Sequence, residues 1–194
     1  ENIYKCEQIL KNCDGILVPG GFGKDGTVGK INAIKISKKL KIPFLGICFG
    51  MQLAILESIS NLRGYKNASS TEFGKTSIPV ISMIHEWIKN KKIVKHDYKN
   101  LGGSMRLGSY TSILLKGSKI YSIYRKNKIN ERHRHRYEVN YNYKKQIEKS
   151  GVVLSGMSPD GNLVEIMERR DHPWFLGVQF HPELKSTPFK PHPI

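Results

Sequence analysis

The chain has 194 residues, which is enough for one domain with a substantial core. Its 32 Lys and Arg against 16 Asp and Glu give a formal net charge of +16. The basic residues are scattered along the sequence, and they do not alternate with aromatic residues as in a nucleic-acid-binding module. This distribution argues against nucleic-acid binding as the main role. No apolar run approaches the ~20 residues of a membrane helix, so we expect no membrane partner. The three cysteines are an odd number and include no CxxC pair, which does not suit a disulfide framework, so we expect a cytoplasmic protein.

The first third of the chain predicts alternating strands and helices. A helical segment over 1–13 precedes a short strand at 15–19, a glycine-rich loop at 20–23 and an amphipathic helix over 30–41. In that helix we expect Ile31, Ile34 and Leu40 to face inward. An apolar strand at 42–47 then leads into a helix over 49–60. This order predicts a parallel sheet with right-handed crossovers.

The remainder of the chain predicts further strands and short helices. Strands are expected at 79–84, 109–115 and 174–180, a short helix at 143–150, and a short helix or an extended segment at 118–125. Residues 152–157 and 163–167 read as a hairpin, because the segment between them is rich in turn-forming residues. The predicted class is therefore α/β, with an open, mostly parallel, flavodoxin-like central sheet, flanking helices and a small antiparallel hairpin, all in one domain spanning 1–194.

Cys48 stands where the apolar strand gives way to the next helix, in the sequence Gly46-Ile47-Cys48-Phe49-Gly50. A sharp turn from strand to helix exposes a nucleophile at the edge of a sheet, as in the elbow of serine hydrolases. The free N–H groups of a helix N-terminus favour negative charge and lower the pKa of a cysteine placed there. The alternative is a small buried cysteine without a chemical role.

A base for this thiol is found near the other end of the chain. The last predicted strand is followed at once by His181-Pro182-Glu183, so His181 lies at a strand end, where parallel sheets place their chemistry. Glu183 can hold the imidazole in one tautomer, which completes a nucleophile, a base and an orienting carboxylate. The alternatives are a surface histidine, a histidine with satisfied hydrogen bonds, or half of a metal site. No further ligands have suitable spacing, so no metal is expected.

The loop Gly20-Gly21-Phe22-Gly23 follows the first strand of the predicted sheet. It fits neither GxxxxGK[ST] nor GxGxxG, which argues against a nucleotide cradle. If it lies beside the elbow, the backbone N–H groups of Gly21 and Phe49 can form an oxyanion hole. An ordinary strand-to-helix turn remains the alternative.

These motifs together resemble the class I (triad) glutamine amidotransferases, and within them the glutaminase domains of the CTP synthase family. The resemblance rests on Pro19-Gly20-Gly21, on the segment 46–52 and on the segment 179–183. The segments 67–73, 101–108, 131–140 and 172–175 resemble CTP synthases in particular. Phe49 departs from the leucine that many members carry, which leaves the backbone N–H in place.

The resemblance implies that Cys48 attacks the side-chain amide of L-glutamine, that His181 transfers the proton and that Glu183 orients His181. It implies that Glu72 pairs with the α-ammonium and that Arg136 lies near the α-carboxylate. It further implies a mobile lid at 101–108. The other residues that it assigns to the glutamine site are Gly21, Phe49, Gly50, Met51 and Gln52, with Phe22 and Arg106 on the side of the lid and of GTP.

The resemblance also implies partners outside this sequence. No cofactor is expected in the domain itself, whereas ATP, Mg²⁺, UTP and GTP are expected to require the N-terminal synthase (amidoligase) domain of the same polypeptide or its interface. The full enzyme is expected to be a homotetramer, and the chain on its own a weak glutaminase. The alternatives are a γ-glutamyl peptidase on the same fold and a non-catalytic basic binding module.

Overall fold

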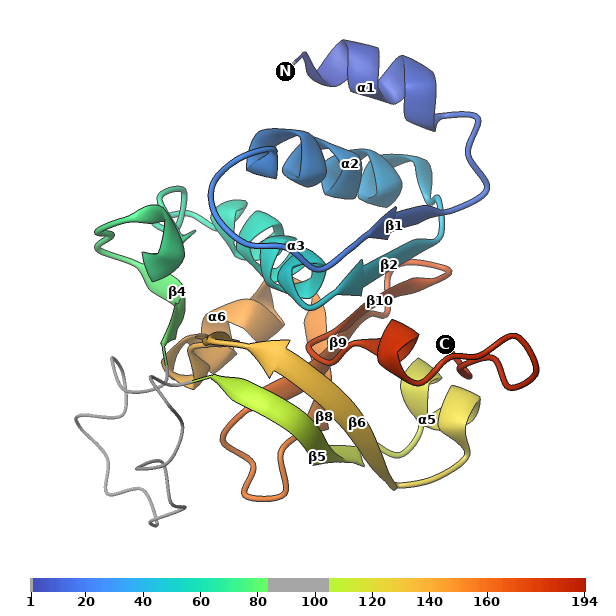
Figure 1. The fold of residues 1–194 in the computed structure, drawn as a ribbon. Coiled ribbons are helices and arrows are strands. Elements are labelled where there is room, and N and C mark those ends of the chain that lie inside the picture. The colour runs from blue at the N-terminus through green and yellow to red at the C-terminus, as the bar shows by residue number, and fades with distance from the viewer. Residues whose placement is uncertain (1, 84–104) are drawn as a thin grey trace.

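The computed structural model describes residues 2–83 and 105–194, which form an α/β structure with two sheets (Figure 1). The large sheet has seven strands in the order β1-β2-β10-β9-β8-β5-β6, and the small sheet has three in the order β3-β4-β7. The strands of the large sheet are β1 Ile16–Val18, β2 Phe44–Ile47, β5 Arg106–Leu114, β6 Lys128–His135, β8 Val152–Met157, β9 Val164–Arg169 and β10 Phe175–Val178. Those of the small sheet are β3 Ser69–Ser70, β4 Pro79–Met83 and β7 Tyr137–Val139.

The helices flank the large sheet (Figure 1). The α-helices are α1 Ile3–Leu10, α2 Thr27–Leu40, α3 Phe49–Ser60, α5 Lys119–Tyr124 and α6 Lys144–Lys149. Short 3-10 turns are found at η1 Thr71–Phe73, η4 Tyr141–Tyr143 and η5 Pro182–Leu184. In Figure 1, α1 and α2 lie above β1 and β2, and β5 and β6 lie at the opposite side of the molecule.

The large sheet combines a parallel part with an antiparallel part. Strand β2 lies between β1 and β10 and pairs parallel with both. From β10 outward, each of the pairs β10–β9, β9–β8, β8–β5 and β5–β6 is antiparallel. The predicted α/β class and the hairpin β8–β9 are confirmed. The antiparallel part is more extensive than the expected small hairpin, because β8 and β9 are continuous with the main sheet on both sides.

Apolar side chains pack on both faces of the large sheet. One cluster joins Ile34 and Ile36 of α2, Leu53 and Ile55 of α3, and Phe44 of β2. A second cluster lies on the other face and includes Cys48 itself with Ile120 of α5, Val178 of β10 and Phe180. The strands that carry the predicted nucleophile and base are therefore held from both sides.

Most predicted elements are confirmed within a few residues, with differences at their ends. Helix α2 begins at Thr27 rather than at 30. Ile34 is buried as expected, but Leu40 is 36 % exposed, since it lies at the end of the helix, where the chain leaves through the left-handed Lys41. Residue 84 of the predicted strand 79–84 and residues 101–104 of the predicted lid lie outside the described residues.

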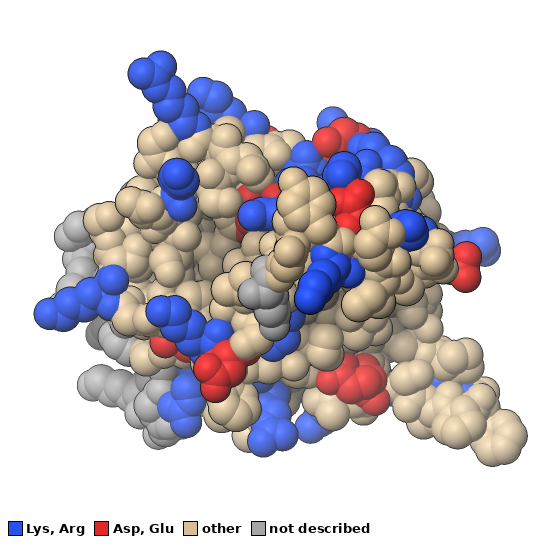
Figure 2. Space-filling model, turned by 90° about the horizontal axis from the view of Figure 1, so that it is seen from above, with Lys and Arg blue, Asp and Glu red and all other residues tan. Residues whose placement is uncertain are grey.

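The excess of basic residues is not gathered into one patch on the face seen in Figure 2. Lysine and arginine side chains are spread over it, with acidic side chains between them. Within the described ranges 2–83 and 105–194, no helix is both long and apolar enough to cross a membrane.

Candidate active site

Cys48 occupies a sharp turn between β2 and α3, as the sequence predicts. Strand β2 ends at Ile47 and helix α3 begins at Phe49, so Cys48 is the residue that caps the helix. Its backbone has φ 51° and ψ −102°, a conformation that is costly for a residue other than glycine. The N–H of Cys48 donates to the carbonyl of Val178 at 2.7 Å, which ties the turn to the neighbouring strand β10. Packing therefore holds the thiol in a strained, fixed position.

Two glycines beside Cys48 allow this turn to pack closely. A Cβ atom at Gly50 would lie 2.1 Å from the carbonyl oxygen of Val18, and one at Gly46 would lie 2.8 Å from the backbone of Gly50. Both contacts are with backbone, which cannot move aside as a flexible side chain can. The first turn of α3 is thus pressed directly against β1 and β2.

Replacing Gly50 with alanine should lower the free energy of unfolding by about 3 kcal/mol, because the added methyl group forces α3 away from β1. Gly15→Ala is the matched control, since its Cβ would make only an ordinary 3.7 Å contact with the carbonyl of Pro43. Urea unfolding followed by circular dichroism measures both variants. Equal stability of the two variants would contradict the close approach of helix and strand.

His181 and Glu183 lie beside the thiol, so the structure brings the three predicted catalytic residues together. The imidazole Nδ1 of His181 lies 2.6 Å from Oε1 of Glu183, and the backbone N–H of His181 donates to the carbonyl of Arg132 on β6 at 2.8 Å. A Cβ atom at Gly20 would lie 2.9 Å from Cε1 of His181 and 3.8 Å from Cβ of Cys48. The glycine loop thus packs across both residues.

The contact with Glu183 determines the tautomer of His181. A carboxylate accepts, so Nδ1 carries the proton and Nε2 keeps a lone pair. Nε2 of His181 is buried and has no hydrogen-bond partner within residues 2–83 and 105–194. That atom is therefore available as a base.

In the same described part of the chain, no group of three or more His, Cys, Asp or Glu residues could hold a metal ion.

The charge state of Cys48 differs from the expectation. Burial is the largest cause that raises the pKa of the Cys48 thiol, and the N–H of Phe49 opposes it. The carboxylates of Glu138, Glu183 and Glu72 also raise this pKa, and the net value is about 12. The helix N-terminus does act in the predicted direction through Phe49, but desolvation outweighs it. At neutral pH the resting thiol is protonated, so a thiolate has to be formed by transfer of the proton to a base.

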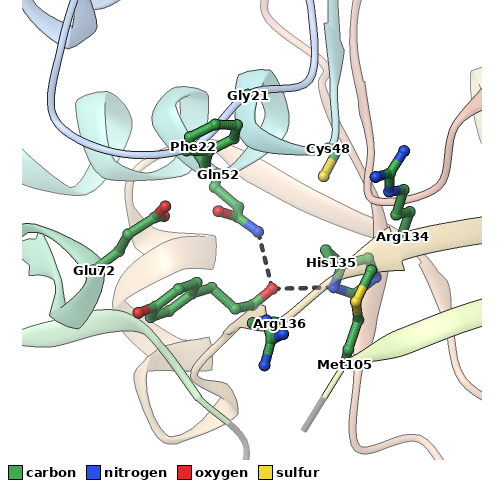
Figure 3. A pocket seen from close by; sticks show the side chains of 10 residues that line it. Gly21, Phe22, Cys48, Gln52, Glu72, Met105, Arg134, His135 and Arg136 are labelled. Atoms are coloured by element: carbon green, nitrogen blue, oxygen red, sulfur yellow. Dashed lines mark hydrogen bonds between the residues drawn. The ribbon is translucent and has the colours of Figure 1, made fainter. Parts of the chain in front are cut away.

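A cavity of about 240 Å³ opens beside the thiol. Figure 3 shows Cys48, Gln52, Glu72 and His135 arranged around it, below the loop that carries Gly21 and Phe22. Its lining residues are Gly21, Phe22, Cys48, Gln52, Glu72, Met105, Arg134, His135, Arg136 and Tyr137. Five of the residues that were expected to contact substrate or lid lie here, namely Gly21, Phe22, Gln52, Glu72 and Arg136.

Glu72 reaches the site from the 3-10 turn η1. Its Oε1 accepts a hydrogen bond from the N–H of Gly23 at 2.7 Å, which joins η1 to the glycine loop. Burial raises the pKa of this carboxyl, while the N–H of Gly23 opposes that shift. The carboxylate therefore offers a partly desolvated negative charge at the end of the cavity opposite Cys48 (Figure 3).

Phe49, Gly50 and Met51 are not among the residues that line the cavity. The Phe49 ring lies under the ammonium of Lys30 at 5.0 Å, and Met51 is fully buried in the core. The helical turn directs these side chains away from the thiol, since α3 places successive residues about 100° apart. The backbone N–H of Phe49 is directed at the sulfur of Cys48.

Arg106 is not on a lid, which corrects the expectation for this residue. It is the first residue of β5, and its guanidinium is buried between Glu138, at 3.0 Å from Nη1, and Glu165, at 2.9 Å from Nη2. Three of the residues in the predicted lid 101–108, namely 106–108, belong to this strand. The glycine content of the segment indicated a loop, whereas the pairing with β6 determines its conformation.

Two groups of residues near the thiol were missed by the sequence interpretation. The side-chain amide of Gln179 donates to Sγ of Cys48 at 3.6 Å. His133 and His135 alternate with exposed arginines along β6 and are buried, with 2.9 Å between Nδ1 of His133 and Nε2 of His135. Both could have been found in the sequence. Gln179 adjoins the His-Pro-Glu motif, and histidines alternate with arginines at the end of β6.

Comparison with known proteins places this site in a family. The model of the family described as "Glutamine amidotransferase class-I" matches residues 1–194. A CTP synthase of Paramagnetospirillum magneticum is 55% identical over 188 residues, covering 96% of this chain and 35% of that protein. One of Pelagibacter ubique is 56% identical over 192 residues, covering 99% of this chain and 36% of that protein. The chain thus spans little more than a third of the length of these relatives.

Solved structures agree with the sequence comparison. The glutaminase domain of Trypanosoma brucei CTPS, with bound acivicin, has a TM-score of 0.85 and 36% sequence identity, and the match covers 98% of this chain and 71% of that one. A glutamine amidotransferase of Thermotoga maritima, at 16% identity and a TM-score of 0.52 over 86% of this chain and 56% of that one, shares the fold. The chain therefore belongs to the class-I glutamine amidotransferase family, and within it to the group of CTP synthase glutaminase domains.

Proposed function

We propose that this chain hydrolyses L-glutamine to glutamate and ammonia through a thioester on Cys48. The observation that carries the proposal is the arrangement of the triad. A cysteine in a strained elbow lies beside an imidazole whose Nδ1 is held by Glu183 and whose Nε2 is buried without a partner in the described part of the chain. This is the geometry that nucleophilic acyl transfer requires.

The reaction begins with transfer of the Cys48 proton to Nε2 of His181. The sulfur then attacks the side-chain carbonyl carbon of glutamine, and the N–H groups of Gly21 and Phe49 stabilise the resulting oxyanion. His181 returns the proton to the amide nitrogen, so the C–N bond breaks and ammonia leaves. A water molecule, deprotonated by His181, next attacks the thioester, and glutamate and the free thiol are released. Glutamine and water thus become glutamate and ammonia, and no redox step is involved.

The cavity beside Cys48 suits an amino acid with charged α-groups. The Glu72 carboxylate lies across the cavity from the thiol and can pair with the α-ammonium. The guanidinium groups of Arg134 and Arg136, which line the same cavity, match an α-carboxylate. A cavity of about 240 Å³ leaves room for a single small substrate.

In the complete protein, we propose that the ammonia aminates UTP to CTP in an N-terminal synthase domain. The support is that the CTP synthases matched by this chain extend well beyond it. ATP, Mg²⁺, UTP and the activator GTP then act in or at that domain, and the full enzyme is a homotetramer. The chain alone should turn over glutamine slowly.

The test of the proposed function is covalent labelling with 6-diazo-5-oxo-L-norleucine, a glutamine-like electrophile. We expect one adduct per chain, located on Cys48 by peptide mass spectrometry and suppressed by excess glutamine. The exposed Cys13 serves as an internal control, because it is accessible but lies outside the cavity. A folded chain that remains unlabelled, or one that is protected by a γ-glutamyl peptide but not by glutamine, would contradict the proposal.

A further inference from the structure

A chain of hydrogen bonds leads from β7 to the sulfur of Cys48. Nε2 of Gln52 donates to the backbone carbonyl of Tyr137 at 2.9 Å and to Oε1 of Gln179 at 3.2 Å. Nε2 of Gln179 in turn donates to Sγ of Cys48 at 3.6 Å, within the range of an N–H···S contact. The amide of Gln52 and the imidazole of His135 both contact the backbone carbonyl of Tyr137, and Figure 3 shows the two contacts converging on one oxygen.

The directions of these bonds follow from chemistry alone. A backbone carbonyl can only accept, so the atom of Gln52 that faces Tyr137 must be the amide nitrogen. The second N–H of the same nitrogen then faces Gln179, whose facing atom must be the carbonyl oxygen. The remaining end of the Gln179 amide, its NH₂ group, is therefore directed at Cys48.

Gln179 is placed where it cannot easily turn around. Its side chain is fully buried, and it directly follows β10, the strand that pairs parallel with the elbow strand β2. Reversing its amide would turn its single carbonyl oxygen toward Cys48 and its NH₂ group toward the NH₂ group of Gln52. Two buried N–H donors would then face each other at Gln52 without an acceptor, which is costly.

We propose that Gln179 is a catalytic residue, whose side-chain N–H stabilises the thiolate of Cys48, and that Gln52 and the Tyr137 carbonyl hold it in that orientation. The inference rests on the proposed function and adds a residue to it. The negative sulfur forms near three carboxylates, those of Glu138, Glu183 and Glu72. Donors aimed at the sulfur oppose that repulsion, and besides the backbone N–H of Phe49, Gln179 supplies such a donor from a side chain.

The test compares Gln179→Met, which removes the donor at similar length, with Gln179→Glu, which keeps an acceptor for Gln52 but presents no N–H when ionised. Gln146→Met on α6, which does not line the cavity, is the matched control. The rate of alkylation of Cys48 is measured with iodoacetamide and with 6-diazo-5-oxo-L-norleucine as a function of pH. Both Gln179 variants should react about tenfold more slowly at pH 7.5, with pH profiles displaced upward by about one unit.

A merely structural role would lower the melting temperature or weaken saturation by the glutamine analogue without displacing the pH profile. Profiles of both Gln179 variants that coincide with the parent profile would overturn the inference. If substitution prevents folding, the parent chain itself supplies the test. One side-chain N–H resonance of Gln179 should shift when Cys48 is replaced by alanine, and an unchanged resonance would overturn the inference.

The two proposals fail in different ways. Absence of labelling by the glutamine analogue in the unsubstituted chain contradicts the proposed function, while the iodoacetamide rates still report on Gln179. Normal labelling of the parent chain together with unaffected Gln179 variants contradicts the role of Gln179 alone.

Discussion

Glutamine hydrolysis by this chain should fall by at least ~10⁴-fold when Cys48 is replaced by serine. A serine hydroxyl is a far weaker acid than a thiol, so transfer of its proton to His181 is much less favourable. The site is also already unfavourable for an anion, since burial raises the pKa even of the thiol to about 12. Glutamate production at saturating glutamine, over incubations long enough for a slow enzyme, measures the effect.

Cys13→Ser is the matched control for this substitution, because Cys13 is exposed and does not line the cavity. It should retain the parent rate. The Cys48→Ser chain should keep the parent melting temperature, since the exchange of one atom leaves the backbone of the elbow unchanged. Glutaminase activity of Cys48→Ser within tenfold of the parent would show that another residue is the nucleophile.

The elbow at Cys48 and the placement of His181 and Glu183 at a strand end could be predicted because their signals are local. Apolar residues up to Ile47, a cysteine and then glycine at 50 specify strand, turn and helix within a few positions. Likewise His181 and Glu183 are two residues apart, and Pro182 ends the extended segment that carries them. Only their proximity to Cys48 required a tertiary assumption, namely that β2 and β10 pair in parallel, and the structure has that pairing.

The charge of the thiol could not be predicted in the same way. The sequence shows that Cys48 precedes a helix, whose N–H groups favour an anion, and this effect is present through Phe49. It does not show how deeply the sulfur is buried or that Glu138, from a strand 90 residues later, lies near it. Desolvation and these distant carboxylates depend on the packing of the whole domain.

The segment Arg132 to Arg136 illustrates a second limit. Alternation along an extended chain predicts that arginines share one face and histidines the other, and β6 has that pattern. Both faces are polar, so hydrophobicity does not indicate which one is buried. The histidine face is buried because Glu165, Arg106 and Phe180 of other elements lie against it. An interpretation based on the arginines alone therefore misses the histidines, whose side chains pack behind the site.

Replacing Arg106 with methionine should lower the free energy of unfolding at pH 8 by about 3–5 kcal/mol. Arg106 is 4 % exposed, and its guanidinium binds two carboxylates that are themselves buried. Methionine fills part of the volume but leaves Glu138 and Glu165 facing each other without a counter-charge. Urea unfolding of the two proteins at matched pH measures the difference.

The loss should be smaller at pH 5.5 than at pH 8, because the sign of the linkage is fixed by the carboxyl groups. Burial already raises the pKa of Glu138, and that of Glu165 to about 7, with Arg106 present and opposing the shift. Removing Arg106 raises both pKa values further above their unfolded values. The folded variant then binds protons that the unfolded chain does not, so its stability falls as pH rises from about 4.5 through the raised values.

The neighbouring histidines act in the same direction. Burial and the charge of Arg106 hold the pKa of His133 and of His135 well below the usual range in the parent chain. Without Arg106, protonation of His133 next to Glu165, 3.4 Å away, can replace part of the lost charge, and acid again favours the folded variant.

The control variant is Arg132→Met, because the side chain of Arg132 is exposed on β6 and its removal also deletes one positive charge. This variant should change the free energy of unfolding by less than ~0.5 kcal/mol at either pH. A deficit for Arg106→Met that is the same at pH 5.5 and pH 8 would contradict this linkage, because it would mean that removal of the arginine does not raise the pKa of Glu138 or of Glu165 in the folded chain.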